Sequence, residues 1–205
     1  MPHSIQIYAI SLYKRSGLMQ IHKCGWCLGN ELYEAYHDKE WGVPVKDDAT
    51  LFEFLVLETF QAGLSWLTVL KKRENFRKAF DNFDYKKIST YNQLKIDALL
   101  QDAGIIRNKL KIRATVTNAR AFLEIQEEFG SFSTYIWGFV NGKPIKNSFA
   151  DHRDNPTKTE ISDELSNDLK KRGFKFVGST VVYAHMQATG MVNDHEINCF
   201  RYEEV

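Results

Sequence analysis

Apolar residues recur three or four positions apart through most of this chain, which is the spacing of one face of an α-helix. In ATLFEFLVLETFQAG, residues 49–63, they predict a helix that Asp47, Asp48 or Thr50 caps and Gly63 interrupts. Similar patterns predict helices from Ser65 through Phe80, from Tyr91 to a left-handed stop at Gly104, from about residue 109 to Phe129, from a cap at Ser162 to Gly173, and from a cap at Ser179 to Gly190. We therefore expect an all-α fold.

Few segments depart from this pattern. FSTYIWGFV, residues 132–140, fits either a short apolar helix or a strand, and FKFVG and YAISLY are short strand candidates. The polar segment 141–160 has a length that suggests a loop with a function or with mobility. No internal repeat is visible.

Composition narrows the class of protein. A net charge of +1 gives no strong pull toward nucleic acid or membranes, so any such affinity depends on where the charges lie. Three cysteines are too few for a disulfide framework, which favours a reducing, cytoplasmic setting. No segment reads as a signal peptide or a membrane span. We expect one monomeric unit over residues 19–205, preceded by an extension over residues 1–18 whose order stays open.

Two cysteine–histidine pairs near opposite ends of the chain suggest a metal site. Twelve residues separate Cys24 from His37, and three separate His195 from Cys199. Four such ligands suit a structural, tetrahedral zinc that would join the two ends of the chain. Ordinary buried cysteines and histidines remain the alternative, and Cys27 and His22 are competing ligands.

An aromatic face and an unusual carboxylate suggest a binding pocket. If LYEAYHDKEW is helical, Tyr33, Tyr36, His37 and Glu40 share one face. Glu58 lies in an apolar run, where a carboxylate is costly unless it has a partner, although a surface position fits the period equally well. Aromatic walls around one carboxylate suit a flat, cationic ring.

Three basic stretches stand out: residues 71–78, 107–113 and 170–175. Most such runs are solvated helix faces. The second, however, follows AGII, where a glycine turn between two helices would present backbone N–H groups to a phosphate, as in a helix-hairpin-helix.

Together these stretches resemble the type I 3-methyladenine DNA glycosylases, within the helix-hairpin-helix glycosylase superfamily. The motifs that carry the resemblance, in family order, are CGW, LYEAYHDKEWGVP, LFEFLVLE, QAGLSWLTVLKKRENFRKAF, QDAGIIRNKLKI, LKKRGFKFVGSTVVYAHMQATGMVNDH and the terminal H-x-x-x-C. They cover residues 24 to about 200, and the segment 141–160 matches poorly.

The resemblance implies hydrolysis of the N-glycosidic bond of 3-methyladenine in alkylated double-stranded DNA, which leaves an abasic site. It implies zinc at Cys24, His37, His195 and Cys199, with no ligand role for Cys27. The base pocket that it implies consists of Glu58, as the catalytic or base-reading group, with Tyr36, Trp66, Tyr33, Trp26 and Trp41. The DNA contacts that it implies are Gly63 and Leu64, which would fill the gap left in the duplex, and Gly104, Arg107 and Lys109 at the hairpin.

One departure from the wider superfamily concerns the chemistry. Many of its members place a catalytic aspartate shortly after the hairpin, and GIIRNKLKIRATVTNARAF offers none. Cationic 3-methyladenine is already a good leaving group, so we expect recognition by Glu58 to matter more than acid–base catalysis. The alternatives are a non-enzymatic, zinc-stabilised helical DNA-binding protein and a hydrolase with a catalytic zinc.

Overall fold

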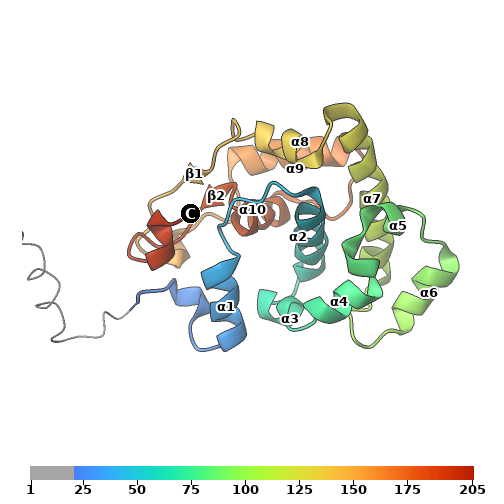
Figure 1. Cartoon of the computed structure of the whole chain (residues 1–205), viewed down its shortest axis with the longest axis horizontal. Helices are drawn as coiled ribbons and strands as arrows, with labels where there is room; N and C mark the ends of the chain where they lie inside the picture. Colours follow the sequence, from blue (N-terminus) through green and yellow to red (C-terminus); the bar gives the residue numbers. More distant parts are fainter. Residues whose placement is uncertain (1–20) are drawn as a thin grey trace, which may run out of the picture.

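The computed structural model describes residues 21–205 and is mostly helical, as expected (Figure 1). The helices are α1 (Glu31–Lys39), α2 (Asp48–Gln61), α3 (Trp66–Leu70), α4 (Arg73–Ala79), α5 (Tyr85–Ser89), α6 (Gln93–Gln101), α7 (Lys109–Phe129), α8 (Phe132–Gly138), α9 (Glu160–Lys171) and α10 (Ser179–Ala188). Four short 3₁₀ turns accompany them, η1 (Gly25–Cys27), η2 (Asp81–Phe83), η3 (His152–Asp154) and η4 (Phe200–Glu203), with two short strands, β1 (Ile145–Lys146) and β2 (Val192–Asn193). The extension 1–18 and the strand candidate YAISLY lie outside the described residues.

Helix α2 is the centre of the core. The Asp47 side chain caps it by accepting from the Thr50 backbone N–H, and nine of its residues, from Leu51 to Phe60, are buried. A helix that is apolar on nearly all sides is stable only when other elements surround it. Here α7, α8 and α10 pack around it. Asp48 accepts hydrogen bonds from the backbone N–H groups of Phe132 and Ser133, which fixes the start of α8 against the start of α2.

The helix expected from Ser65 through Phe80 is two helices, α3 and α4, with a break at Lys71 and Lys72. The periodicity did not reveal the break because the residues on both sides are good helix formers. At this break Lys72 contacts the loop after α6, because its Nζ donates to the carbonyl oxygens of Ala103 and Gly104 at 3.2 and 3.0 Å.

The expected left-handed stop at Gly104 is wrong, because α6 ends at Gln101 and Gly104 has no positive φ. Glycine is needed there for a close approach. Its backbone N–H donates to Asp102 Oδ1 at 2.7 Å, and a Cβ would lie 2.9 Å from that oxygen and 3.3 Å from Asn75 Cβ. The loop 102–108 is thereby held against α4.

Near the C-terminus two expected caps shift and one strand candidate fails. Thr159, not Ser162, caps α9, and Ser162 is its partner in a capping box. Helix α10 begins at Ser179, with Gly178 at the cap position. FKFVG is a connection without strand structure, since its backbone pairs with no strand. Gly190 ends α10 with φ +67° as expected, and a Cβ there would lie 2.5 Å from the backbone of Pro44.

The segment 141–160 is not a free loop. β1 pairs in parallel with β2, Ile145 opposite Val192, and the pairing continues as an isolated bridge between Phe149 and Glu196. The polar loop expected from the sequence is therefore laid along the C-terminal segment. The beginning and end of the described chain also meet, because the Phe200 backbone N–H donates to the His22 carbonyl at 3.0 Å (Figure 1).

Candidate active site and metal cluster

The four side chains predicted as metal ligands lie together. Cys24 Sγ is 3.4 Å from His195 Nδ1, and Cys199 Sγ is 3.4 Å from His37 Nε2 and 3.6 Å from His195 Nδ1. All four residues are buried, and their ligand atoms lie within 4.8 Å of one another. Tetrahedral zinc with bonds of about 2.0–2.3 Å places its ligand atoms about 3.3–3.8 Å apart, so these separations fit a shared metal.

Hydrogen bonds outside the cluster orient both imidazoles. His37 Nδ1 lies 2.8 Å from Asp38 Oδ1, and His195 Nε2 lies 3.1 Å from the carbonyl oxygen of Trp41. Each acceptor fixes the proton on the outer nitrogen, which leaves the inner nitrogen with a lone pair toward the cluster. Hydrogen bonding from the Cys24 thiol lowers the pKa of Cys199 despite its burial. This favours the thiolate, the form that binds metal.

The competing ligands lie outside this cluster. Cys27 is buried, and its Sγ donates to the Cys24 carbonyl at 3.1 Å. His22 Nε2 lies 3.3 Å from Glu196 Oε2. Neither belongs to the group of four within the described chain. The C-x-x-C spacing therefore reflects a 3₁₀ turn, η1, and not a pair of ligands.

A cavity of about 260 Å³ opens beside the cluster. All six residues predicted for the base pocket line it, namely Trp26, Tyr33, Tyr36, Trp41, Glu58 and Trp66. They come from η1, α1, the turn after α1, α2 and α3, so the structure brings together side chains spread over about 40 residues of sequence.

The aromatic walls pack on one another and on the metal cluster. The Trp26 ring centroid lies 4.9 Å from that of Tyr33 and 5.0 Å from that of Trp41, in edge-to-face geometry. Trp41 in turn lies 4.6 Å from the His195 ring. Because edge-to-face pairs are rigid and favourable contacts, the wall formed by Trp26 and Trp41 depends on the position of the cluster.

Glu58 is the exceptional group of the cavity. The residue is only 4% exposed, and Oε2 has no hydrogen-bond partner in the part of the chain that the structure describes. The surface position that the period also allowed is therefore wrong. Burial raises the pKa of Glu58 to about 8, since nothing nearby offsets the loss of hydration of a carboxylate. A buried acid without a partner in a cavity is typical of a group kept for a ligand.

The state of Glu58 makes stability depend on pH. Its pKa in the folded chain, about 8, exceeds the ordinary 4.5, so the folded state binds more protons between these values. The free energy of unfolding therefore falls as pH rises from about 4.5 to about 8, by an amount on the order of 5 kcal/mol. We expect Glu58→Gln to remove this fall, so its melting temperatures at about pH 5 and about pH 8.5 should differ less than those of the wild type. Equal differences in the two proteins would contradict a neutral Glu58.

The turn after α2 has the form of an exposed wedge. Gly63 has φ +84° with no atom within 4 Å of a built Cβ, and Leu64 is 43% exposed.

One residue that contacts this turn was missed from the sequence. Lys111 is buried within α7, and its Nζ donates to the carbonyl oxygens of Phe60 and Ala62 at 3.0 and 2.6 Å. Lys111 thus ties the turn to the start of α7.

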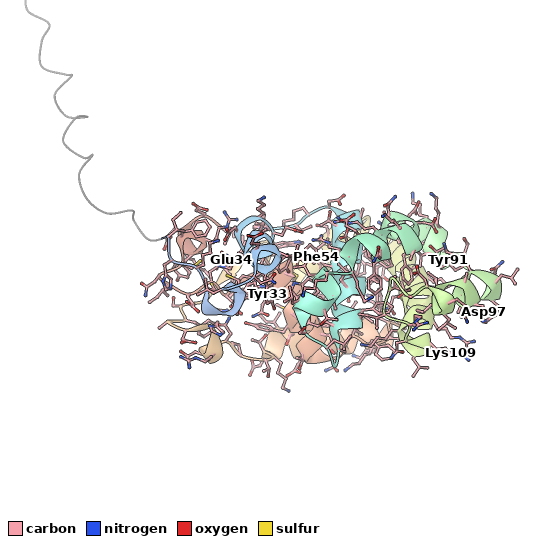
Figure 2. All side chains as sticks on the ribbon, turned by 90° about the horizontal axis from the view of Figure 1, so that it is seen from below. Tyr33, Glu34, Phe54, Tyr91, Asp97 and Lys109 are labelled. Carbon is pink, nitrogen blue, oxygen red and sulfur yellow. The ribbon has the colours of Figure 1, made fainter. Side chains whose placement is uncertain are left out.

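The loop between α6 and α7 presents the other predicted contacts. Asn108 caps α7 by accepting from two backbone N–H groups, and Arg107 and Lys109 beside it are exposed. Within residues 21–205 neither forms an ion pair. In Figure 2, Tyr33 lies in the left part and Lys109 in the right part of the same view of the molecule. The cavity that Tyr33 lines and the loop before α7 are therefore two separate sites.

The other two basic stretches are partly neutralised by ion pairs. Arg73 is buried and pairs with Glu40 and Glu53, and Arg77 pairs with Glu53 as well. In the third stretch, Arg172 donates to Glu128 and Asp168. These arginines stabilise the fold, so the expectation of three similar solvated faces is too simple.

Five residues of the cavity were missed from the sequence: Gln61, His152, Asn155, Ala184 and Gln187. Two of them come from the segment 141–160 and two from α10, which no local pattern connects with the aromatic face. The only available signal was the unusual length of the polar segment.

Comparison with known proteins shows the family of the chain. A family model described as methyladenine glycosylase matches residues 26–202. The chain belongs to this family. It is 50% identical to DNA-3-methyladenine glycosylase 1 of Escherichia coli (strain K12), over 89% of this chain and 97% of the relative. It is 52% identical to DNA-3-methyladenine glycosylase of Haemophilus influenzae, over 86% of this chain and 96% of the relative.

A solved structure resembles the fold closely. It concerns the structural basis of 3-methyladenine recognition by 3-methyladenine DNA glycosylase I from Staphylococcus aureus, with a TM-score of 0.85, 37% identity, and coverage of 88% of this chain and 96% of that chain. Members of this family are glycosylases, so the protein is an enzyme, and the non-enzymatic alternative no longer holds. No helix among the described residues is long and apolar enough to cross a membrane.

Proposed function

We propose that this glycosylase removes 3-methyladenine from alkylated double-stranded DNA by hydrolysing its N-glycosidic bond. The observation that carries the proposal is the partnerless carboxyl group of Glu58 in a cavity walled by tryptophan and tyrosine. The named activity of relatives about 50% identical to the chain supports it. The DNA that it would act on implies a cytoplasmic location, and we propose that it acts as a monomer.

In this mechanism the damaged nucleotide leaves the duplex and its base enters the cavity. Flipping costs a few kcal/mol, and least for a weakly paired lesion, so selection begins before the base arrives. Tyr36 and Trp66, whose ring centroids lie 5.3 Å apart, offer faces on which the base stacks. The methylated base is cationic, and the negative faces of these rings attract it.

Glu58 responds to the charge of the base. In the empty cavity its raised pKa keeps much of it protonated near neutral pH. A cation beside it lowers that pKa, so the base binds to a carboxylate with release of a proton. The C1′–N9 bond then breaks with its electron pair moving to the base, which becomes neutral. Water adds to the oxocarbenium-like sugar and loses a proton to the solvent, which completes the hydrolysis.

The cluster of Cys24, His37, His195 and Cys199 is proposed to hold a structural zinc ion. Its four donors are buried and at tetrahedral separations, which supports this assignment. Bound there, zinc supplies cross-linking of the two ends of the chain. Four protein ligands leave no open position for water, which argues against the hydrolase alternative with a catalytic zinc.

The surface between Tyr33 and Lys109 is the proposed DNA face. Leu64 is proposed to fill the gap left by the flipped base. The helices α6 and α7 with the loop 102–108 are proposed to act as a helix-hairpin-helix, in which Gly104 allows the close turn and Arg107 and Lys109 contact phosphates.

Removing the hairpin charges should weaken DNA binding without altering the pocket. For Arg107→Ala and Lys109→Ala we expect the slope of log K against log salt concentration to decrease by about 1 each. The slope is obtained from binding constants for a duplex with an abasic-site analogue, which fluorescence anisotropy measures at several salt concentrations. Lys170→Ala, at an exposed position of α9, is the matched control. An unchanged slope in the first two variants would exclude them from the interface.

The decisive test of the function uses methylated duplex DNA. The wild-type protein should release free 3-methyladenine, detected by chromatography, and leave abasic sites in equal number. If no 3-methyladenine appears, the proposal is wrong. Release of 7-methylguanine in comparable amount would still be glycosylase activity, but it would contradict a narrow specificity for 3-methyladenine.

A further inference from the structure

A second acceptor without a partner belongs to a residue that lines the cavity. Asn155 lines the cavity together with Glu58, and its Oδ1 is buried without any hydrogen-bond partner among residues 21–205. A buried amide oxygen left unpaired costs on the order of 1–3 kcal/mol. Such a group in a native structure is explained if a ligand satisfies it.

The orientation of this amide follows from its other atom. Asn155 Nδ2 donates to the carbonyl oxygen of Asp194 at 3.2 Å. A carbonyl oxygen only accepts, so the NH₂ group must face Asp194 and the oxygen must be the unpaired atom. The unpaired Oδ1 of Asn155 is therefore an acceptor.

The wall that carries Asn155 is held firmly. Three residues earlier, the backbone N–H and Nδ1 of His152 lie 3.1 and 2.9 Å from Glu196 Oε1, which also accepts from the Gly25 backbone N–H at 2.9 Å. The His152 ring packs so closely on Gly25 that a Cβ there would lie 2.9 Å from it. Because Asp194 and Glu196 flank His195, the wall is fastened to the same segment as the metal cluster.

We propose that Asn155 is a specificity-determining residue, whose Oδ1 accepts a hydrogen bond from the exocyclic amino group of the flipped base. The inference rests on the proposed function. An amino group has two N–H bonds, and Glu58 and Asn155 together provide two acceptors for a base of this kind. A purine with an oxo group in that place presents a lone pair to both acceptors and leaves them unpaired, which costs more than a lost contact.

The test varies the base and the side chain together. Wild type and Asn155→Ala are titrated with free 3-methyladenine and with 3-methylhypoxanthine, which carries an oxo group in place of the amino group. Quenching of tryptophan fluorescence reports binding, because Trp26, Trp41 and Trp66 line the cavity. We compare the dissociation constant for 3-methylhypoxanthine divided by that for 3-methyladenine. This ratio should fall roughly threefold to tenfold in the variant, the range for one hydrogen bond.

A structural role alone predicts a different result. If Asn155 only supports the wall, its loss weakens both ligands equally and the ratio is unchanged, which would overturn the inference. Asn167→Ala on the exposed side of α9 is the matched control, with an unchanged ratio. Should Asn155→Ala not fold, NMR of the wild type decides: the Asn155 side-chain amide should shift with 3-methyladenine and not with 3-methylhypoxanthine, and equal shifts would overturn the inference.

Failure of the inference and failure of the function are distinguishable. A wild type that neither releases 3-methyladenine from methylated DNA nor binds the free base contradicts the proposed function. A wild type that does both, with an Asn155→Ala variant of unchanged ratio, contradicts only the role of Asn155.

Discussion

Glu58→Gln should lower kcat/KM for 3-methyladenine release roughly 10²-fold, since removing one partner of a buried charge pair costs about 2–5 kcal/mol. Glu58 is the carboxylic acid of the cavity, and burial keeps water from substituting for it. Glutamine has nearly the same shape but cannot become an anion when the cationic base arrives. Single-turnover release from methylated duplex DNA measures the effect.

Two features make this test specific. Glu58→Gln should not be less stable than the wild type above about pH 8, because it removes a buried acid that is ionised there, so lost activity cannot come from unfolding. Glu124→Gln, on the exposed side of α7, is the matched control and should retain full activity. A Glu58→Gln variant with wild-type kcat/KM would remove Glu58 from both recognition and catalysis.

Cys199→Ser should lose the stoichiometric zinc and melt at least about 10 °C below the wild type. A serine hydroxyl is not deprotonated at neutral pH and does not replace a thiolate ligand. The proposed ion would join η1 and α1 to the segment after β2, so its loss would free both ends of the described chain and weaken the packing of Trp26 and Trp41. A loss of a few kcal/mol corresponds to this shift in a domain of this size. Metal analysis and thermal melting of the same preparation measure both effects.

Cys27→Ser provides the control for this experiment. Cys27 is equally buried, and its Sγ donates to the Cys24 carbonyl, which a serine hydroxyl also does. Its zinc content should equal that of the wild type. Zinc lost from Cys27→Ser and kept by Cys199→Ser would show that the ligand set is wrong. Partial loss of activity in Cys199→Ser is also expected, since the aromatic wall rests on the cluster.

The helices and the common face of Tyr33 and Tyr36 were predictable from the sequence, because both follow from spacing within one element. The pocket roles of Trp26, Trp41 and Trp66, which lie in other segments, were implied by the family resemblance. Tyr33 and Tyr36 share a face of α1 simply because they are three positions apart. The limits of elements were less predictable. The break between α3 and α4 depends on Lys72 reaching the loop at Gly104, and Gly104 itself is required by Asp102 and Asn75 and not by helix termination.

The basic stretches show the same division. Their positions were evident, but the sequence did not distinguish Arg73, which is buried between two glutamates, from Arg107, which is exposed. The difference depends on Glu40 and Glu53, from helices that approach only in the folded chain. Lys111 is a further case, since a cation that caps the carbonyl end of α2 belongs to another helix 50 positions away.

By itself, the sequence determined the helical class and two cysteine–histidine pairs that could bind metal, because each is set by residue type and short spacing, and the family resemblance implied the aromatic residues of the pocket. Only the tertiary structure decided that Glu58 Oε2 has no hydrogen-bond partner among residues 21–205, that Cys27 stays outside the cluster, and that His152 and Asn155 also line the cavity. These features depend on which segments, distant along the chain, meet. Whether a side chain there is buried or hydrogen-bonded depends on contacts between the two segments, so it cannot be read from either segment alone.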